Sequence, residues 1–484
     1  MIDARLSLGD VGSQPRVHGL VCNTGSSTVE VFAARHLSID TGLDAGVTWV
    51  WAGEGSDPYP QVRSSTEVHR KHGSSSDLEG VKIVFEQEQG KPRITVVRTN
   101  GSRTPLYASY SDDTLTVSWR YERAVSGAKV LVPDSGFIKD YIEVGRRRVR
   151  GTVFQGIQSL WAGEAVVFDE AGVRFLECPV SGIVVPGTLR VSARATDAFA
   201  SLIRESSAVA VAAARSPVME LSGGYDSTCV GLAVRSLRDD WSSYSVIQQG
   251  AAGRQQRERR RELLDILGAN DQELDYVNIP GPIAALEIPE NRVTTLDDNH
   301  RTSCATMLDG HPCGPFDVAL TGIGGDELTM TDTFRADKDE LPGSIATSAS
   351  VAAAGRADLF MRRGIWPINP LTSQSVVDYC RALPQEMREG RALNTLFLAR
   401  SGFSDGFIFP PYREHCGGRM MSEIYEVDYE KDLAGALLAD LGIVDVASYL
   451  KEIRWGLFTD YTARHAVKLW SIYKVEAVLR RYMT

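Results

Sequence analysis

Two glycine-rich turns in this sequence carry side chains that can bind phosphate groups and a divalent cation. The first has the sequence Ser-Gly-Gly-Tyr-Asp-Ser over residues 222–227 and follows an apolar run. Its glycines let the backbone turn tightly and point several N–H groups at one anion, and a helix predicted over 229–237 adds its positive dipole end. Hydroxyl groups add donors, and Asp226 adds a carboxylate suited to Mg²⁺. The predicted pyrophosphate-binding residues are Leu221, Ser222, Gly223, Gly224, Asp226, Ser227 and Thr228.

The second turn, Thr-Gly-Ile-Gly-Gly-Asp-Glu-Leu over residues 321–328, also follows an apolar run. In an open parallel sheet, both turns lie at the carboxyl ends of strands, where ligands bind. We therefore predict that Gly322 and Ile323 contact ATP. Asp226 and Asp326 are predicted to share one Mg²⁺ and to serve as catalytic residues. The alternative is that the acidic residues of the second turn merely complement the dipole of a following helix.

In their order and spacing, the two turns resemble the synthetase domain of the asparagine synthetase family, which belongs to the N-type ATP pyrophosphatases. The resemblance covers residues 190–420 and implies ATP and Mg²⁺ as cofactors. It also implies that the segment 244–247 is a strand that passes the adenine, which adds Val246 to the predicted ATP-binding residues. A helix over 259–268 and a strand over 276–280 are expected to follow.

The first 190 residues are predicted to be rich in β-strands. Predicted strands include 81–85, 93–97 and 114–119. The segment 157–168 resembles the end of the family's N-terminal glutaminase domain, an Ntn-type fold. Glutamine-dependent relatives carry a nucleophilic cysteine directly after the initiator methionine, whereas this chain has Ile2, and Cys22 is expected to be a core residue. The resemblance therefore implies a degenerate glutaminase-like domain that serves as a scaffold or binds substrate.

Two further features depart from asparagine synthetases. Ile323 stands where those enzymes carry a glutamate and β-lactam synthetases a tyrosine, and an isoleucine side chain cannot move protons. The motif over 321–328 is instead similar to that of lasso-peptide cyclases. The late lysine of these relatives is missing from the segment 409–415, so the catalytic positive charge is expected from Arg413 or Arg400.

Lasso-peptide cyclases join a peptide's N-terminal amine to an Asp or Glu side chain, which requires no glutaminase. The resemblance thus implies an enzyme that adenylates a substrate carboxylate, releases pyrophosphate and forms an intramolecular amide (isopeptide) bond. The substrate is expected to be a peptide or a small carboxylic acid, with a leader-binding protein and a leader protease as candidate partners. Three alternatives stay open: a β-lactam-type or other small-molecule amide ligase, an ammonia-dependent asparagine synthetase, and an inactive binding module of a biosynthetic complex.

The composition fits a globular chain of two domains, which we place at 1–190 and 191–484. The expected fold class is α/β, with a β-rich first domain, a parallel sheet in the second, and a helical extension whose last helix, 463–482, packs on the core. No apolar run is long enough to span a membrane, and the seven cysteines are scattered without a CxxC pair, which favours reduced thiols in the cytoplasm. A net charge of −10 gives no overall attraction to nucleic acid or to an anionic membrane.

Five arginines gather between residues 254 and 261. They follow the predicted adenine strand, so they could help to bind ATP or an acidic peptide. Glu258 and Glu262 allow the other interpretation, in which the arginines form ordinary ion pairs along a helix.

Overall fold

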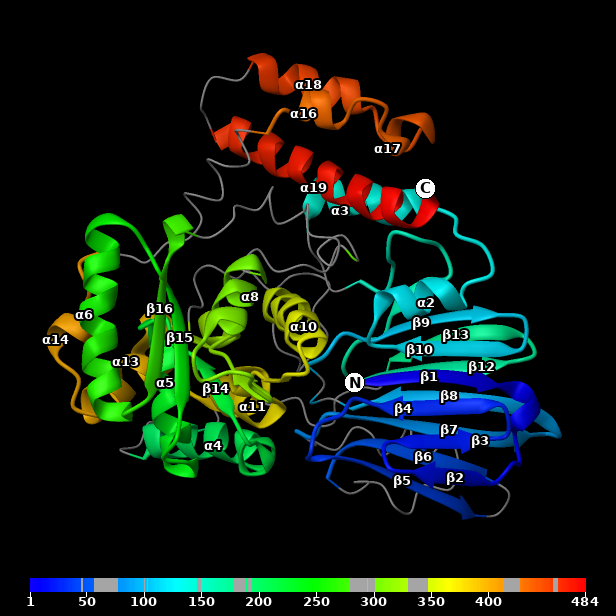
Figure 1. The fold of residues 1–484 in the computed structure, drawn as a ribbon, viewed down its shortest axis with the longest axis horizontal. Coiled ribbons are helices and arrows are strands. Elements are labelled where there is room, and N and C mark those ends of the chain that lie inside the picture. The colour runs from blue at the N-terminus through cyan, green and yellow to red at the C-terminus, as the bar shows by residue number, and fades with distance from the viewer. Residues whose placement is uncertain are drawn as a thin grey trace.

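The protein is described from a computed structural model (Figure 1). The structure describes residues 1–44, 47–55, 77–99, 101, 103–145, 149–177, 189, 194–278, 294, 301–329, 347–412, 427–455 and 460–484. Two antiparallel sheets form the first part of the chain, and a parallel sheet with helices on both faces forms the next part. The predicted α/β architecture is confirmed at this level. No helix among the described residues is both long and apolar enough to cross a lipid bilayer.

Both N-terminal sheets are antiparallel. The seven-stranded sheet has the order β11-β9-β10-β1-β4-β3-β2 and consists of β1 (Ile2–Ser7), β2 (Pro15–His18), β3 (Val21–Thr24), β4 (Ser27–Val31), β9 (Tyr107–Ser111), β10 (Thr114–Ser118) and β11 (Ile157–Ser159). The six-stranded sheet has the order β13-β12-β8-β7-β6-β5 and consists of β5 (Leu37–Asp44), β6 (Val47–Glu54), β7 (Gly80–Glu88), β8 (Lys91–Arg98), β12 (Glu164–Asp169) and β13 (Gly172–Glu177). The alternation along β1 is typical, because Ile2, Ala4 and Leu6 are buried on one face. The three strands predicted from β-branched residues correspond to β7, β8 and β10.

The parallel sheet has the order β16-β15-β14-β17-β18. Its strands are β14 (Pro217–Glu220), β15 (Ser242–Ile247), β16 (Asn270–Asp275), β17 (Val318–Leu320) and β18 (Trp366–Ile368). One face packs against α4 (Ala195–Ala213), α5 (Tyr225–Val234), α11 (Gln374–Ala382) and α13 (Ala392–Arg400), and the other against α8 (Arg301–Gly310) and α10 (Thr347–Arg362). The strand order reverses between β14 and β17, and this reversal is the topological switch point of the sheet.

The edge of this sheet differs from the prediction. Helix α6 (Gly250–Leu267) begins earlier than expected and ends one residue before the predicted end at Gly268, which has a left-handed φ of 66°. The strand expected over 276–280 is wrong for its described part, because Tyr276–Asn278 forms a 3₁₀ turn after β16, and residues 279 and 280 lie outside the described residues. An edge strand needs no continuous apolar run, and the acidic side chains of β16 instead bind arginines of α6.

Further short helices connect these elements. They are α9 (Gly325–Thr329), α12 (Gln385–Arg388) and α14 (Asp405–Ile408), with 3₁₀ turns at Leu8–Asp10, Arg235–Leu237, Pro370–Thr372 and Glu389–Arg391.

The last helices return to the N-terminal region (Figure 1). They are α16 (Tyr429–Asp432), α17 (Leu437–Asp440), α18 (Val446–Trp455) and α19 (Asp460–Met483). Their apolar side chains, among them Leu469 and Leu479, form one buried cluster with α2 (Tyr121–Gly127) and α3 (Ser135–Val144). Helix α19 therefore packs on a core, as predicted, but that core belongs to the N-terminal region and not to the parallel sheet.

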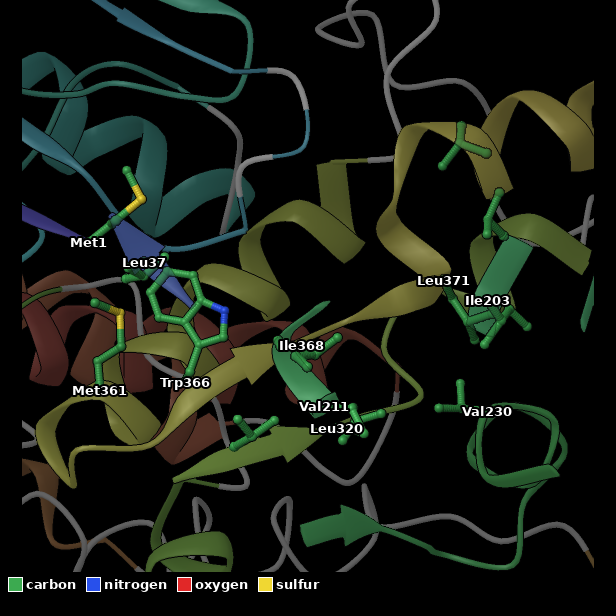
Figure 2. Packing of buried hydrophobic residues seen from close by; sticks show 14 of the residues in the cluster. Met1, Leu37, Ile203, Val211, Val230, Leu320, Met361, Trp366, Ile368 and Leu371 are labelled. Atoms are coloured by element: carbon green, nitrogen blue, oxygen red, sulfur yellow. The ribbon is translucent and has the colours of Figure 1, made fainter. Parts of the chain in front are cut away.

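The largest hydrophobic cluster joins the N-terminal region to the parallel sheet. Figure 2 shows Trp366 of β18 beside Met1, Leu37 and Met361, all buried. The Trp366 indole N–H donates to the Glu54 carboxylate over 3.2 Å, so the buried ring also has a polar partner. Cys22 belongs to the same cluster and is 1% exposed, and burial raises the pKa of its thiol, which confirms its assignment to the core.

Candidate functional site

The two glycine-rich turns lie against each other at the switch point. Strands β14 and β17 pair in parallel, so the turns that follow them project from the same edge of the sheet. A Cβ atom on Gly322 would lie 2.6 Å from the backbone nitrogen of Ser227, and one on Gly325 would overlap the Asp226 carboxylate. Gly322 and Gly325 are therefore required by the direct packing of the second turn on the first turn.

The first turn is organised by its own hydroxyl groups. Gly223 has a φ of +83°, which a side chain would disfavour. The Gly224 N–H donates to Ser222 Oγ over 3.1 Å, and Ser222 Oγ lies 3.1 Å from Ser227 Oγ. From the side, Gln256 of α6 donates to the carbonyls of Ser222 and Val246, each over 3.0 Å. This network fixes the turn in front of the N-terminus of α5.

A pocket of about 740 Å³ opens where the two turns meet. The predicted residues that line it are Ser222, Gly224, Asp226, Ser227, Gly322, Ile323 and Asp326. In the part of the chain that the structure describes, four predicted residues stand outside the pocket wall: Leu221, Gly223, Thr228 and Val246. Leu221 and Thr228 are fully buried, so they support the turn from behind.

The two predicted metal-binding aspartates are held around a single cation, the Arg391 guanidinium. One of its terminal nitrogens bonds to the Asp326 carboxylate, and the other lies 3.6 Å from Asp226 Oδ2. The Asn394 side chain donates to Asp226 Oδ1 over 2.8 Å. Burial raises the pKa of Asp226 to about 7, against the effect of Arg391 and with a further contribution from the charge on Asp326. The carboxylates are therefore close enough to share one positive charge.

This pair of carboxylates fits the needs of Mg²⁺. No group of three or more His, Cys, Asp or Glu side chains gathers as a metal site among the described residues. Mg²⁺ in nucleotide sites is commonly held by one or two carboxylates together with substrate phosphates and waters. Asp226 and Asp326 supply such a set beside backbone N–H groups suited to phosphate.

Arg391 was missed in the sequence analysis. It follows Gly390, and both residues have left-handed backbone angles, with φ values of 57° and 63°, just before α13. Its guanidinium lies 5.2 Å from the centre of the Tyr225 ring, and the Tyr225 hydroxyl donates to the Ile408 carbonyl. A Gly-Arg pair before a helix is the only local signal, and no motif marks it.

Neither of the two arginines predicted to supply a catalytic charge is found in the described part of the pocket wall. Arg400 donates to Thr196 Oγ1 over 2.7 Å and lies 3.6 Å from Asp197, so it binds α4 and is not part of the pocket wall. Arg413 lies outside the described residues, although Tyr412 directly before it lines the pocket.

The arginine cluster of α6 divides between two roles. One interpretation expected ion pairs along the helix. Arg257 and Arg260 instead pair with acidic residues of β16. Arg259 lines the pocket, with its guanidinium 4.6 Å from the centre of the Phe407 ring. Of these three arginines only Arg259 lies in the pocket wall, so the other interpretation, binding of ATP or an acidic peptide, stays a prediction for Arg259.

Comparisons with known proteins do not assign the chain to a family. No family model and no curated protein matches it. Two solved structures that it resembles weakly are described as the allosteric regulatory enzyme of purine biosynthesis and as glutamine phosphoribosylpyrophosphate amidotransferase from B. subtilis complexed with ADP and GMP. The first is 10% identical, covering 57% of this chain and 74% of the other, with a TM-score of 0.21. The second is 8% identical, covering 80% and 96%, with a TM-score of 0.20. Neither resemblance is strong enough to indicate a function.

Proposed function

We propose that this protein is an AMP-forming ligase related to asparagine synthetases, which activates a carboxylate as its adenylate and then joins it to an amine. The observation that carries the proposal is the contact between the two glycine-rich turns. It brings backbone N–H groups, two serine hydroxyls and two aspartates to one pocket at the switch point. That combination suits a polyphosphate bound with a divalent cation.

Each group in the pocket has a role in this proposal. The turn over 222–227 holds the pyrophosphate part of ATP, and Asp226 and Asp326 hold Mg²⁺. When bound, Mg²⁺ neutralises charge on the leaving pyrophosphate. Arg391 adds a fixed positive charge at the same end of the pocket and takes the role that sequence analysis gave to Arg413 or Arg400.

The apolar side chain of Ile323 in the pocket wall favours the lasso-cyclase type of reaction among the related ligases. An asparagine synthetase or a β-lactam synthetase would carry a polar residue there. We propose a peptide or small-acid substrate that supplies the carboxylate, with the amine held in the same pocket so that positioning drives amide formation. A leader-binding protein and a leader protease remain proposed partners for a peptide substrate.

The test measures the products formed from ATP and Mg²⁺ across a panel of peptides and small carboxylic acids. The proposal predicts AMP and pyrophosphate, with Asp326→Ala reducing pyrophosphate release by about 100-fold. Asp309→Ala is the matched control, because Asp309 pairs with Arg363 at the surface of the same region. ADP and phosphate as products would refute adenylation.

A further inference from the structure

Glu220 is a charged residue at the end of the central strand of the parallel sheet. Side chains alternate along β14, so Glu220 points to the same face as Val218, which packs with Leu359 of α10. Central strands of parallel sheets are covered on both faces and are normally apolar. A carboxylate at this position therefore needs a partner or a function.

An arginine behind Glu220 fixes its carboxylate at the pocket. Arg356 Nη1 lies 2.5 Å from Glu220 Oε2, and Cys304 Sγ lies 3.8 Å from Glu220 Oε1. The Arg356 side chain is 5% exposed and that of Glu220 is 26% exposed. Both residues line the same pocket as Ser222 and Asp226. The ion pair holds the Glu220 carboxylate on the side of the pocket.

The charged side chains of the pocket wall are Arg259 and two ion-paired sets. Asp226, Asp326 and Arg391 form one group, which the proposed function assigns to the metal and the polyphosphate. Glu220 suits neither the binding of polyphosphate nor that of the metal, because its negative charge repels phosphate and Arg356 already binds one of its carboxylate oxygens. A carboxylate accepts several hydrogen bonds, so it can bind a second cationic donor.

We propose that Glu220 forms the binding subsite for the amine substrate, which it holds as a primary ammonium group. This inference rests on the proposed function and names the class of its second substrate. An amine is mostly protonated at neutral pH and cannot attack until it loses a proton. A fixed carboxylate both attracts the ammonium and accepts that proton, which Ile323 cannot do.

The ammonium gives one proton to the Glu220 carboxylate, and the free amine nitrogen forms a bond to the acyl carbon of the adenylate. The bond from that carbon to the phosphate oxygen breaks, and its electron pair leaves with AMP. The second proton lost from the nitrogen passes to water, and Glu220 then returns its own proton to water.

A matched ion pair on the same helix separates this role from a structural one. Arg362 of α10 binds Glu122 of α2 through two hydrogen bonds of 2.7 and 2.9 Å, and Glu122 is not part of the pocket. If Glu220 merely ties α10 to β14, Glu220→Gln and Glu122→Gln will differ only in stability. If Glu220 binds the amine, only Glu220→Gln will change amine binding.

Saturation-transfer NMR with n-butylammonium as the probe tests the subsite directly, using the full chain with ATP and Mg²⁺ and n-butanol as the uncharged control. We expect saturable amine binding to the unaltered protein and to Glu122→Gln, and binding at least tenfold weaker to Glu220→Gln. Equal binding to both variants, or no binding to the unaltered protein, would overturn the inference. Ammonium chloride, added in parallel as a competitor, should displace n-butylammonium only at higher concentration, and displacement at equal or lower concentration would overturn the assignment to a primary amine.

Two further measurements test the subsite if Glu220→Gln does not fold and separate failure of the subsite from failure of the proposed function. Should Glu220→Gln not fold, a crystal of the unaltered protein soaked with 4-bromobenzylammonium shows by bromine anomalous scattering whether the amine lies at Glu220 or elsewhere, and a site elsewhere overturns the inference. Titration of the same samples with ATP and Mg²⁺ separates the two proposals. If ATP binds and the amine does not, only the subsite fails, whereas absence of ATP binding removes the proposed function.

With any acid that supports pyrophosphate release, the choice of nucleophile adds a kinetic test. Hydroxylamine is uncharged at neutral pH and needs no proton acceptor before attack. Glu220→Gln should therefore form the hydroxamate at the rate of the unaltered protein and the n-butyl amide at least tenfold more slowly. An equal loss with both nucleophiles would contradict the role given to Glu220.

Discussion

The N-terminal region and the parallel-sheet region use their polar groups in opposite ways. In the N-terminal region, the Glu79 carboxylate accepts hydrogen bonds from the backbone of Arg103 and from Thr104 Oγ1, and lies 3.5 Å from the Arg98 guanidinium. These groups satisfy one another inside the fold. At the switch point, by contrast, Ser222, Asp226 and Asp326 face a pocket. Polar groups that bond to one another inside the fold are typical of a structural role. Polar groups that converge on a pocket are typical of a binding or catalytic site.

Among substitutions in the two regions, Gly325→Ala is expected to have the largest effect on ATP affinity. The added methyl group would overlap the Asp226 carboxylate and push the two turns apart. We expect a loss of ATP affinity of more than about 100-fold and a loss of about 1–3 kcal/mol in the free energy of unfolding. Calorimetric titration and denaturant unfolding measure the two quantities. Gly310→Ala is the control, because its methyl group would meet no atom closer than 4.0 Å; an equal effect of both substitutions would contradict direct packing of the turns.

A second prediction concerns the cation between the aspartates. Arg391→Met should lower pyrophosphate release by about 100-fold, because a fixed charge at the site of charge development is lost. Arg391→Lys should retain part of the rate. Arg400→Met should leave the rate unchanged, because Arg400 binds α4 instead of the pocket. Initial rates of pyrophosphate release at saturating ATP decide which arginine supplies the positive charge. A greater loss with Arg400→Met than with Arg391→Met would assign that charge to Arg400.

A substitution in the cluster that α19 shares with the N-terminal region should weaken the fold without altering the site. Leu479 of α19 is fully buried in the cluster shared with α2 and α3. Leu479→Ala should cost about 2–3 kcal/mol in the free energy of unfolding through the cavity it leaves. ATP affinity measured well below the unfolding transition should stay within about twofold of the unaltered value. A large loss of affinity in the folded variant would show that the C-terminal helices contribute to the site.

The smallest effect is expected at Thr228, a predicted pyrophosphate-binding residue. Its side chain is fully buried, and its hydroxyl has no hydrogen-bond partner among the described residues. Thr228→Val should therefore leave ATP affinity unchanged and alter the free energy of unfolding by less than about 1 kcal/mol. A tenfold loss of affinity would return Thr228 to the phosphate site.

The glycine-rich turns could be predicted because their residue types impose local geometry, and parallel strands bring their ends together. Arg391 could not be predicted in this way, since it reaches Asp326 across 65 positions of the chain through a backbone path that no local pattern encodes. The apolar residues at helical spacing in α19 predicted that one face of this helix is buried, but they did not predict that it packs against the N-terminal region. Strand β16 was missed because an edge strand stabilised by ion pairs lacks the apolar run on which the prediction depended.

The central claim is that the two turns form one site for ATP and Mg²⁺. Calorimetric titration of the full chain with ATP, in the presence and absence of Mg²⁺, tests it without knowledge of the acceptor. We predict saturable binding of one ATP per chain that Mg²⁺ strengthens and that Asp226→Ala weakens by at least about tenfold. Asp309→Ala should bind as the unaltered protein does. Binding that is indifferent to both Mg²⁺ and Asp226, or no binding, would contradict the account.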